Sequence, residues 1–260
     1  MRVYVSIAVA SVCAVLGLLL CGDSTSAQGG GNWGAVKGRI VYDGDSVPET
    51  KEITVDKDQN HCLSKGKLYS EELVVNKENK GVRYTFVWLA PGKGEPPLQI
   101  HPNLQKPKQI NVEIDQPCCQ FVPHALGMRD GQILIAKNSA PIAHNVHWTG
   151  HPIKNPGGNQ IVPAGQQIAI NNLQADRFPV KVNCDIHGWM TAWVRVFDHP
   201  YFAVTDENGK FEIKQAPAGK CRLIIWHESG WGPGMKDGQP IAIEAGKTGE
   251  LGEIKFKPPQ

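Results

Sequence analysis

The sequence predicts an all-β protein, organised as two β-sandwiches. Its 260 residues include 28 glycines and 19 prolines, spread evenly, so turns interrupt the chain at short intervals. Apolar residues recur in short runs, and the longer periodicity of amphipathic helices is missing. The length is that expected for two domains. A net charge of +2, with no basic cluster interleaved with aromatic residues, argues against nucleic acid as a partner.

Residues 1–27 have the pattern of a signal peptide. Arg2 gives a positive start, residues 7–21 are apolar, and Thr25-Ser26-Ala27 is a small-residue cleavage site. The apolar run is shorter than the roughly 20 residues of a membrane span. We therefore expect export to the periplasm or the extracellular space. A lipid anchor at Cys21 stays an alternative, although Leu20 is large for the position before a lipidated cysteine.

An N-terminal β segment is expected over residues 28–108. A Gly-rich leader opens it, and the turn pair Asp43-Gly44 ends the first strand. Residues 91–107 hold several prolines and are predicted to be a connector. The strands are expected at residues 35–42, 72–76 and 82–89, the last rich in aromatic and β-branched side chains.

The next segment, residues 109–197, carries a cluster of metal-binding side chains. Cys184, His187 and Met190 follow the spacing Cys-x2-His-x2-Met, and His144 precedes the cysteine by forty positions. Two imidazoles, a thiolate and a weak thioether are the ligand set of a type 1 (blue) copper site, because Cu(I) prefers sulfur and Cu(II) prefers nitrogen. A disulfide cysteine beside a surface histidine is the simpler alternative for Cys-x2-His alone. The complete pattern predicts one copper ion held by these four residues.

Strands are expected to position that cluster. The predicted strands of this segment are residues 133–136, 166–171, 178–184 and 191–197. Alternation places Phe178, Val180, Val182 and Cys184 on one face, pointing into the core. In the partner strand, Ala192, Val194 and Val196 share one face, and Trp193, Arg195 and Phe197 share the other. His147, three residues after His144, should point to the opposite face of its strand and is predicted not to be a ligand.

Both stretches resemble the cupredoxins, such as plastocyanin and amicyanin. The similarity is carried by Asn138 to Val146, which contains His144-Asn145-Val146, and by the short Cys-x2-His-x2-Met loop. It implies a Greek-key β-sandwich over residues 109–197, with Asn145 joining the two ligand segments by hydrogen bonds. It also implies that the ring edge of His187 reaches the surface for electron transfer. Asn183 differs from plastocyanins, which usually have an aromatic residue there.

Trp189 lies between two of the predicted ligands, where amicyanin-like loops also carry an aromatic residue. It could shield copper from water or form part of an apolar docking patch beside His187. Simple packing in the core is an equal alternative.

The C-terminal segment, residues 198–260, is predicted to be a second group of strands. A hairpin with an Asn208-Gly209 turn is expected over residues 202–213, and a strand over residues 220–226. The Asp-x-x-Gly-x-Phe and Pro-x-Gly patterns resemble carboxypeptidase-regulatory, transthyretin-like β-sandwich modules, and residues 36–41 resemble their first strand. The resemblance implies one sandwich split between residues 28–108 and 198–260, with the copper domain inserted. As a whole the chain is similar to methylamine-utilisation-like exported bacterial proteins.

Seven cysteines constrain the disulfides. Cys13 and Cys21 lie in the signal segment and Cys184 is a predicted ligand. The remaining four can form one or two disulfides in an oxidising compartment. These four are Cys62, Cys118, Cys119 and Cys221. Cysteines adjacent in sequence rarely bond each other, so we expect Cys62 to pair with Cys118 or Cys119.

The expected function is electron transfer by a carrier that is not itself an enzyme. The sequence has no His-x-His pair of a multicopper oxidase and no nucleophile elbow, phosphate-binding loop or haem attachment motif. The expected partner is an electron donor or acceptor protein such as a c-type cytochrome. Two alternatives stay open. One is copper storage, delivery or sensing without redox turnover, and the other is a structural β-sandwich scaffold with a degenerate copper domain.

Overall fold

The computed structural model describes residues 32–259 together with Met1, and almost all of its regular elements are strands. The predicted all-β class is confirmed. The predicted signal segment, including Cys21, lies outside the described residues apart from Met1. In the part of the chain that is described, no helix has the length and apolar character needed to cross a membrane. The helical elements there are α1 (Gln59–Cys62), η1 (Pro102–Leu104) and η2 (Met235–Asp237).

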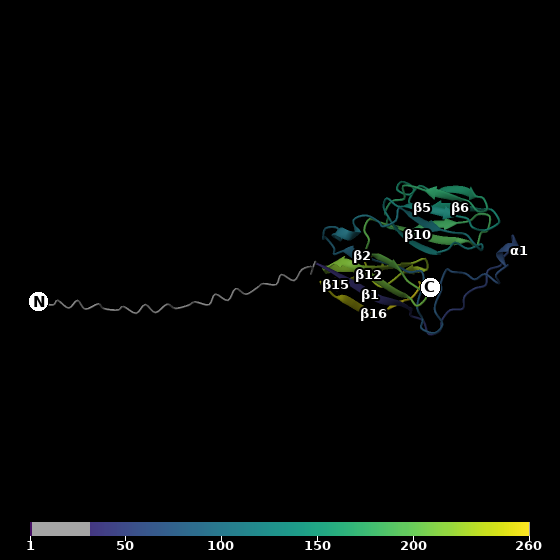
Figure 1. Ribbon diagram of the computed structural model, residues 1–260. Helices are drawn as coiled ribbons and strands as arrows, with labels where there is room; N and C mark the ends of the chain where they lie inside the picture. The colour runs from purple at the N-terminus through teal and green to yellow at the C-terminus, as the bar shows by residue number, and fades with distance from the viewer. Residues whose placement is uncertain (2–31, 260) are drawn as a thin grey trace. The chain divides into compact units, whose positions relative to one another are not determined.

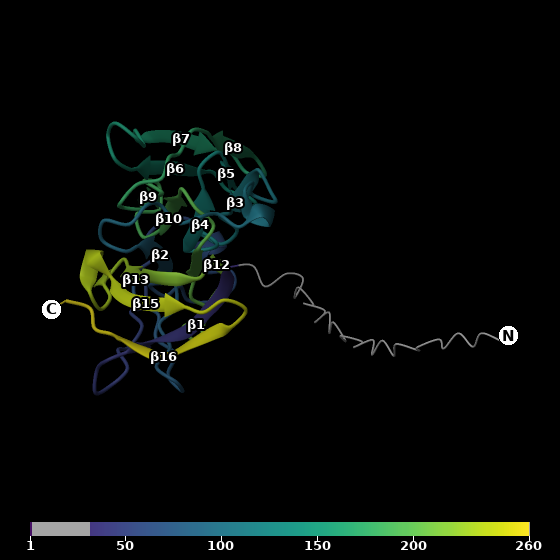
Figure 2. The ribbon, with the colours of Figure 1, turned by 90° about the vertical axis from the view of Figure 1, so that its left-hand side faces the viewer.

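Strands β1 to β16 form four sheets (Figures 1 and 2). Their bounds are β1 Trp33–Tyr42, β2 Phe86–Pro91, β3 Asn111–Ile114, β4 Ala125–Arg129, β5 Ile133–Lys137, β6 His144–Thr149, β7 Gly158–Val162, β8 Gln167–Ile170, β9 Val180–Asn183, β10 Thr191–Phe197, β11 Phe202–Val204, β12 Lys210–Pro217, β13 Gly219–His227, β14 Gly230–Trp231, β15 Gln239–Ile243 and β16 Thr248–Phe256.

The first sandwich, here the site sandwich, consists of a five-stranded sheet in the order β4-β10-β9-β6-β7 and a three-stranded sheet in the order β3-β5-β8. Side chains from both sheets share one core, because alternate residues of each strand face inward. Leu134 of β5, Val146 of β6 and Val182 of β9 are fully buried there. In Figure 2 these strands form the upper group.

The second sandwich joins strands from the two ends of the described chain. β1 lies between β12 and β16, and β2 lies between β11 and β13. Its core contains Ile40 of β1, Leu89 of β2, Leu223 of β13 and Phe256 of β16. Strands that precede the site sandwich in the chain and strands that follow it therefore share one core, as a split sandwich requires. The domain boundaries drawn from the sequence stay a prediction.

A third apolar cluster connects the two sandwiches. Strand β2 is buried on both faces, so its sequence is a continuous apolar run. Val87 and Leu89 face the second core, whereas Phe86 and Trp88 pack with Phe197 of β10 in the third cluster. The second sandwich thus covers much of the far face of β10, where Arg195 and Phe197 are buried.

Residues 53–62, here called the cap segment, leave the second sandwich and pack on the site sandwich. Val55 and Cys62 are buried in the core of the site sandwich. Cys62 forms a disulfide with Cys119, which confirms the expectation that it pairs with Cys118 or Cys119. The segment contains α1 and is thereby fixed beside the loop between β9 and β10.

Three local predictions are wrong. Residues 72–76 form only an isolated bridge, between Val75 and Val82. The Asn208-Gly209 turn is present, but β11 pairs with β2 and β12 pairs with β1, so the predicted hairpin joins two sheets. Phe178 precedes β9 and is 57% exposed, so it does not share the inward face of Val180 and Val182. Its ring packs edge-on near Trp231 instead.

Candidate metal centre

Two neighbouring strands bring the predicted ligands to one end of the site sandwich. His144 opens β6, and Cys184 directly follows β9. The two strands pair antiparallel, with His147 opposite Asn183, so their adjacent ends place His144 and Cys184 close together. The loop from Cys184 to Met190 is closed by a hydrogen bond of 3.2 Å from Cys184 N–H to the Met190 carbonyl.

Three donor atoms converge on one point. Nδ1 of His144 lies 3.0 Å from Nδ1 of His187, and Cys184 Sγ lies 3.9 Å and 3.8 Å from these two nitrogens. For bonds of about 2.0 Å to nitrogen and about 2.3 Å to sulfur, three donors around one metal ion stand roughly 3.0–4.0 Å apart. The observed separations fit a single ion held by two imidazoles and one thiolate.

Burial sets the chemical state of these donors. The side chains of His144 and His187 are fully buried, and Cys184 is 1% exposed and free of any disulfide. Burial, the largest cause, and the neighbouring His187 together lower the pKa of His144 to about 4. His144 is therefore neutral at pH 7, which is the form of imidazole that binds metals. Its Nε2 has no hydrogen-bond partner among the described residues, so Nδ1 is the nitrogen directed at other donors.

Met190 ends the loop that carries Cys184 and His187, and Asn145 forms hydrogen bonds to the same loop. Met190 is 1% exposed in the same core, and its N–H donates to the His187 carbonyl at 2.9 Å. Asn145 Oδ1 accepts hydrogen bonds from the N–H groups of Asp185 at 2.7 Å and Ile186 at 3.1 Å. Its own N–H points to Cys184 Sγ at 3.5 Å. One side chain thus ties the β6 segment to the loop that carries the cysteine.

His187 is not at the surface, which corrects the expectation of an exposed ring edge. Its Nε2 lies 2.8 Å from Oδ2 of Asp58 in the cap segment. The disulfide sulfurs of Cys62 and Cys119 lie within 4.8 Å of a His187 ring nitrogen and of one another. Nothing in the local sequence around Asp58 indicates this contact, because 129 positions separate the two residues.

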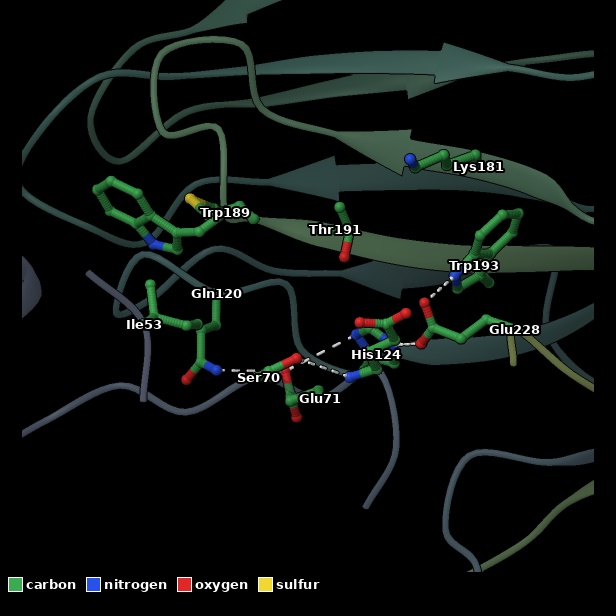
Figure 3. Close-up of a pocket in the computed structure, with 12 residues that line it drawn as sticks. Ile53, Ser70, Glu71, Gln120, His124, Lys181, Trp189, Thr191, Trp193 and Glu228 are labelled. Carbon is green, nitrogen blue, oxygen red and sulfur yellow. Dashed lines mark hydrogen bonds and ion pairs between the residues drawn. The ribbon is translucent and has the colours of Figure 1, made fainter. Parts of the chain in front are cut away.

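The opposite side of the loop faces a cavity of about 470 Å³ (Figure 3). Trp189 lies at one end of this cavity, and His124, Glu228 and Trp193 lie at the other. Met190 also lines it. The indole of Trp189 stands edge-on to the His187 ring, 5.2 Å between centroids, and its Nε1–H donates to the Cys119 carbonyl at 3.0 Å. Trp189 therefore links His187 to a solvent-accessible pocket.

His147 takes no part in the converging group. Its Nδ1 lies 3.0 Å from Asp185 Oδ1, and both side chains are partly exposed. Asp185 also accepts from the side-chain amides of Asn159 and Asn183, and these contacts, His147 first, lower its pKa. This network stabilises the outer face of the loop rather than the metal donors.

The chain matches no protein-family model and no curated protein. Part of it is similar to solved structures of amicyanin variants. One, in the Cu(I) form, is 15% identical over 35% of this chain and 87% of that chain, with a TM-score of 0.31. Another, in the oxidised state, is 17% identical over 34% of this chain and 83% of that chain, also at 0.31. A purple cupredoxin from Nitrosopumilus maritimus is 16% identical over 33% of this chain and 99% of that chain, at 0.28. These similarities cover about a third of the chain, and the candidate metal centre rests on the distances among His144, Cys184 and His187.

Proposed function

We propose that this chain is an exported type 1 copper protein that carries single electrons between redox partners. The observation that supports this most is the convergence of His144 Nδ1, His187 Nδ1 and Cys184 Sγ within 3.9 Å of one another. A His2Cys set with a nearby methionine suits copper in both oxidation states. Bound there, copper would supply a one-electron Cu(II)/Cu(I) couple.

Each residue has a distinct role in the proposal. Cys184 supplies the thiolate, and His144 and His187 supply neutral nitrogens. Met190 is the proposed weak axial ligand, supported by its burial in the same core. Asn145 keeps the β6 end and the Cys184 loop in register, so that the donors keep their places when the charge at the site changes.

Trp189, rather than the ring edge of His187, is the proposed contact for electron exchange. Asp58 covers His187 Nε2, whereas Trp189 is half-buried, touches the His187 ring and lines the cavity of Figure 3. Aromatic side chains often face partners because one edge packs and the other meets solvent. The proposed partner is a redox protein such as a c-type cytochrome, met in the periplasm or outside the cell.

An electron carrier fits this site better than an enzyme. His144, Cys184, His187 and Met190 are each at most 1% exposed. Catalytic metal sites keep an open coordination position for water or substrate. A set of donors closed off in this way favours transfer of electrons over binding of a substrate at the metal.

A second candidate is copper storage or sensing without redox turnover. The burial of His187 beneath Asp58 favours it, because no ligand edge is presented to a redox partner. Rapid mixing of the Cu(II)-loaded protein with a reduced c-type cytochrome distinguishes the two functions. Single-electron oxidation of the cytochrome, slowed in Trp189→Leu, supports the carrier. Copper bound at one equivalent with no electron exchange supports storage.

A further inference from the structure

The two ring nitrogens of His187 have different partners. Nδ1 faces His144 and Cys184, while Nε2 lies 2.8 Å from the Asp58 carboxylate. The imidazole is fully buried, and the Asp58 side chain is 42% exposed. The carboxylate therefore reaches from the edge of the protein to a ring that solvent does not touch.

The cap segment holds Asp58 in that position. The residue has φ of 47° and ψ of 37°, a left-handed conformation that Asp and Asn tolerate better than other non-glycine residues. Its carbonyl accepts the N–H groups of His61 and Cys62 at the start of α1. Cys62 is bonded to Cys119, and the Cys119 carbonyl accepts the Trp189 indole N–H. Backbone, disulfide and indole contacts together fix the carboxylate against His187.

Such a contact has two physical consequences for a metal ligand. A carboxylate that accepts the Nε2–H proton leaves Nδ1 free as the metal-binding nitrogen and fixes the plane of the ring. Its negative charge also favours the state of the site with the higher positive charge. Because Asp58 is partly exposed, solvent weakens this second effect without removing it.

We propose that Asp58 is a positioning residue for His187 that also favours Cu(II) over Cu(I) at this site. The inference rests on the proposed copper site and adds to it a residue from a distant segment. It explains why a ligand histidine is closed off from solvent here. Asp58 of the cap segment is the charged partner of His187, and the same contact closes the His187 ring off from solvent.

Three variants separate charge from hydrogen bonding. Asp58→Asn keeps an acceptor oxygen and the left-handed backbone but removes the charge, whereas Asp58→Gly removes both charge and acceptor and still permits positive φ. Asp56→Asn is the matched control. Asp56 is exposed in the same segment, and its carboxylate has no hydrogen bond or ion pair among residues 32–259.

The first measurement is the reduction potential of the copper-loaded proteins by spectroelectrochemistry, with Cu(II) and Cu(I) affinities by competition. Asp58→Asn should raise the potential, and a tenfold loss of Cu(II) affinity relative to Cu(I) corresponds to about 59 mV. Asp58→Gly should lower Cu(II) affinity by about 10- to 100-fold. Asp56→Asn should match the wild type. Equal potentials in Asp58→Asn and Asp56→Asn would overturn the charge effect.

The second measurement needs no metal. Nitrogen-15 NMR of the metal-free protein reports which ring nitrogen of His187 carries the proton. The wild type should show the Nε2–H form, and Asp58→Gly should show a mixture. An Nδ1–H form in the wild type would overturn the positioning role. If the wild type shows Nε2–H but binds no copper, the proposed function fails while the Asp58–His187 pairing stands.

Discussion

The Nδ1 atoms of His144 and His187 lie 3.0 Å apart, although the two histidines are 43 positions apart in the chain. Each is buried, and Cys184 Sγ lies within 3.9 Å of both. Two imidazole nitrogens and a sulfur this close in a dry core are costly to leave without a partner, unless a proton or a metal is shared among them.

The Cys62–Cys119 disulfide should stabilise both the fold and the cap segment. It closes a loop with a sequence separation of 57 residues, for which the chain-entropy model gives about 4 kcal/mol. Cys62→Ser/Cys119→Ser should lose roughly 2–4 kcal/mol in urea unfolding. It should also bind Cu(II) more weakly, because Asp58 is released. Cys118→Ser is the control, since Cys118 is free. Unchanged unfolding in the double variant would contradict this role.

Asn145 should matter for the geometry of the site. Asn145→Ala leaves the N–H groups of Asp185 and Ile186 without their acceptor, a cost of about 1–3 kcal/mol. Metal affinity should fall with stability, because the Cys184 loop loses its tie to β6. Thermal unfolding with and without Cu(II) measures both effects. Asn111→Ala, at an exposed position of β3, should change neither.

Glu228 should hold the two sandwiches together. Its carboxylate bonds to His124 Nε2 and accepts the Trp193 indole N–H at 2.9 Å, and its side chain is 11% exposed (Figure 3). Glu228→Ala removes these partners from the buried His124 and the partly buried Trp193, and should cost about 1–3 kcal/mol by urea unfolding. The exposed Glu207→Ala should cost much less. Equal urea midpoints for Glu228→Ala and Glu207→Ala would contradict a stabilising contact between the two sandwiches through Glu228.

His227 should make the fold sensitive to acid. Burial, the largest cause, lowers its pKa to about 4 against an ordinary value of 6.5. The unfolded chain therefore takes up a proton before the folded one does, and stability falls as pH drops from 6.5 toward 4. The loss from this group reaches at most roughly 3 kcal/mol. His227→Asn, although less stable at pH 7, should lose less between these pH values. If the free energies of unfolding of the wild type and of His227→Asn change with pH in the same way, His227 is not the group that makes the fold sensitive to acid.

Local sequence patterns predicted where several strands begin and end. Apolar alternation located β1, β5 and β10 within two residues of their observed bounds. The pattern did not indicate which strands are covered on both faces. It put Trp193, Arg195 and Phe197 of β10 on one face but gave no sign that Arg195 and Phe197 are buried against the second sandwich. Contacts of that kind depend on a partner surface that no local window of sequence contains.

The candidate site also contains residues that the sequence could predict and one residue that it could not. The convergence of His144, Cys184 and His187 could be predicted from their residue types and spacing, whereas Met190 as a fourth ligand stays a prediction. Asp58 could not be predicted, because an aspartate before a short helix gives no sign of which buried ring it meets. Its place is set by the Cys62–Cys119 link and by the packing of Val55 and Cys62 in the core of the site sandwich.

Absorption spectroscopy during titration with Cu(II) tests the central claim most directly, run on the wild-type protein and on Cys184→Ser. A thiolate bound to Cu(II) gives an intense visible charge-transfer band, whereas nitrogen and oxygen ligands give only weak colour. We predict a band that saturates at one equivalent in the wild type and is absent in Cys184→Ser. A colourless wild-type complex, or an unchanged band in the serine variant, would contradict a copper centre at His144, Cys184 and His187.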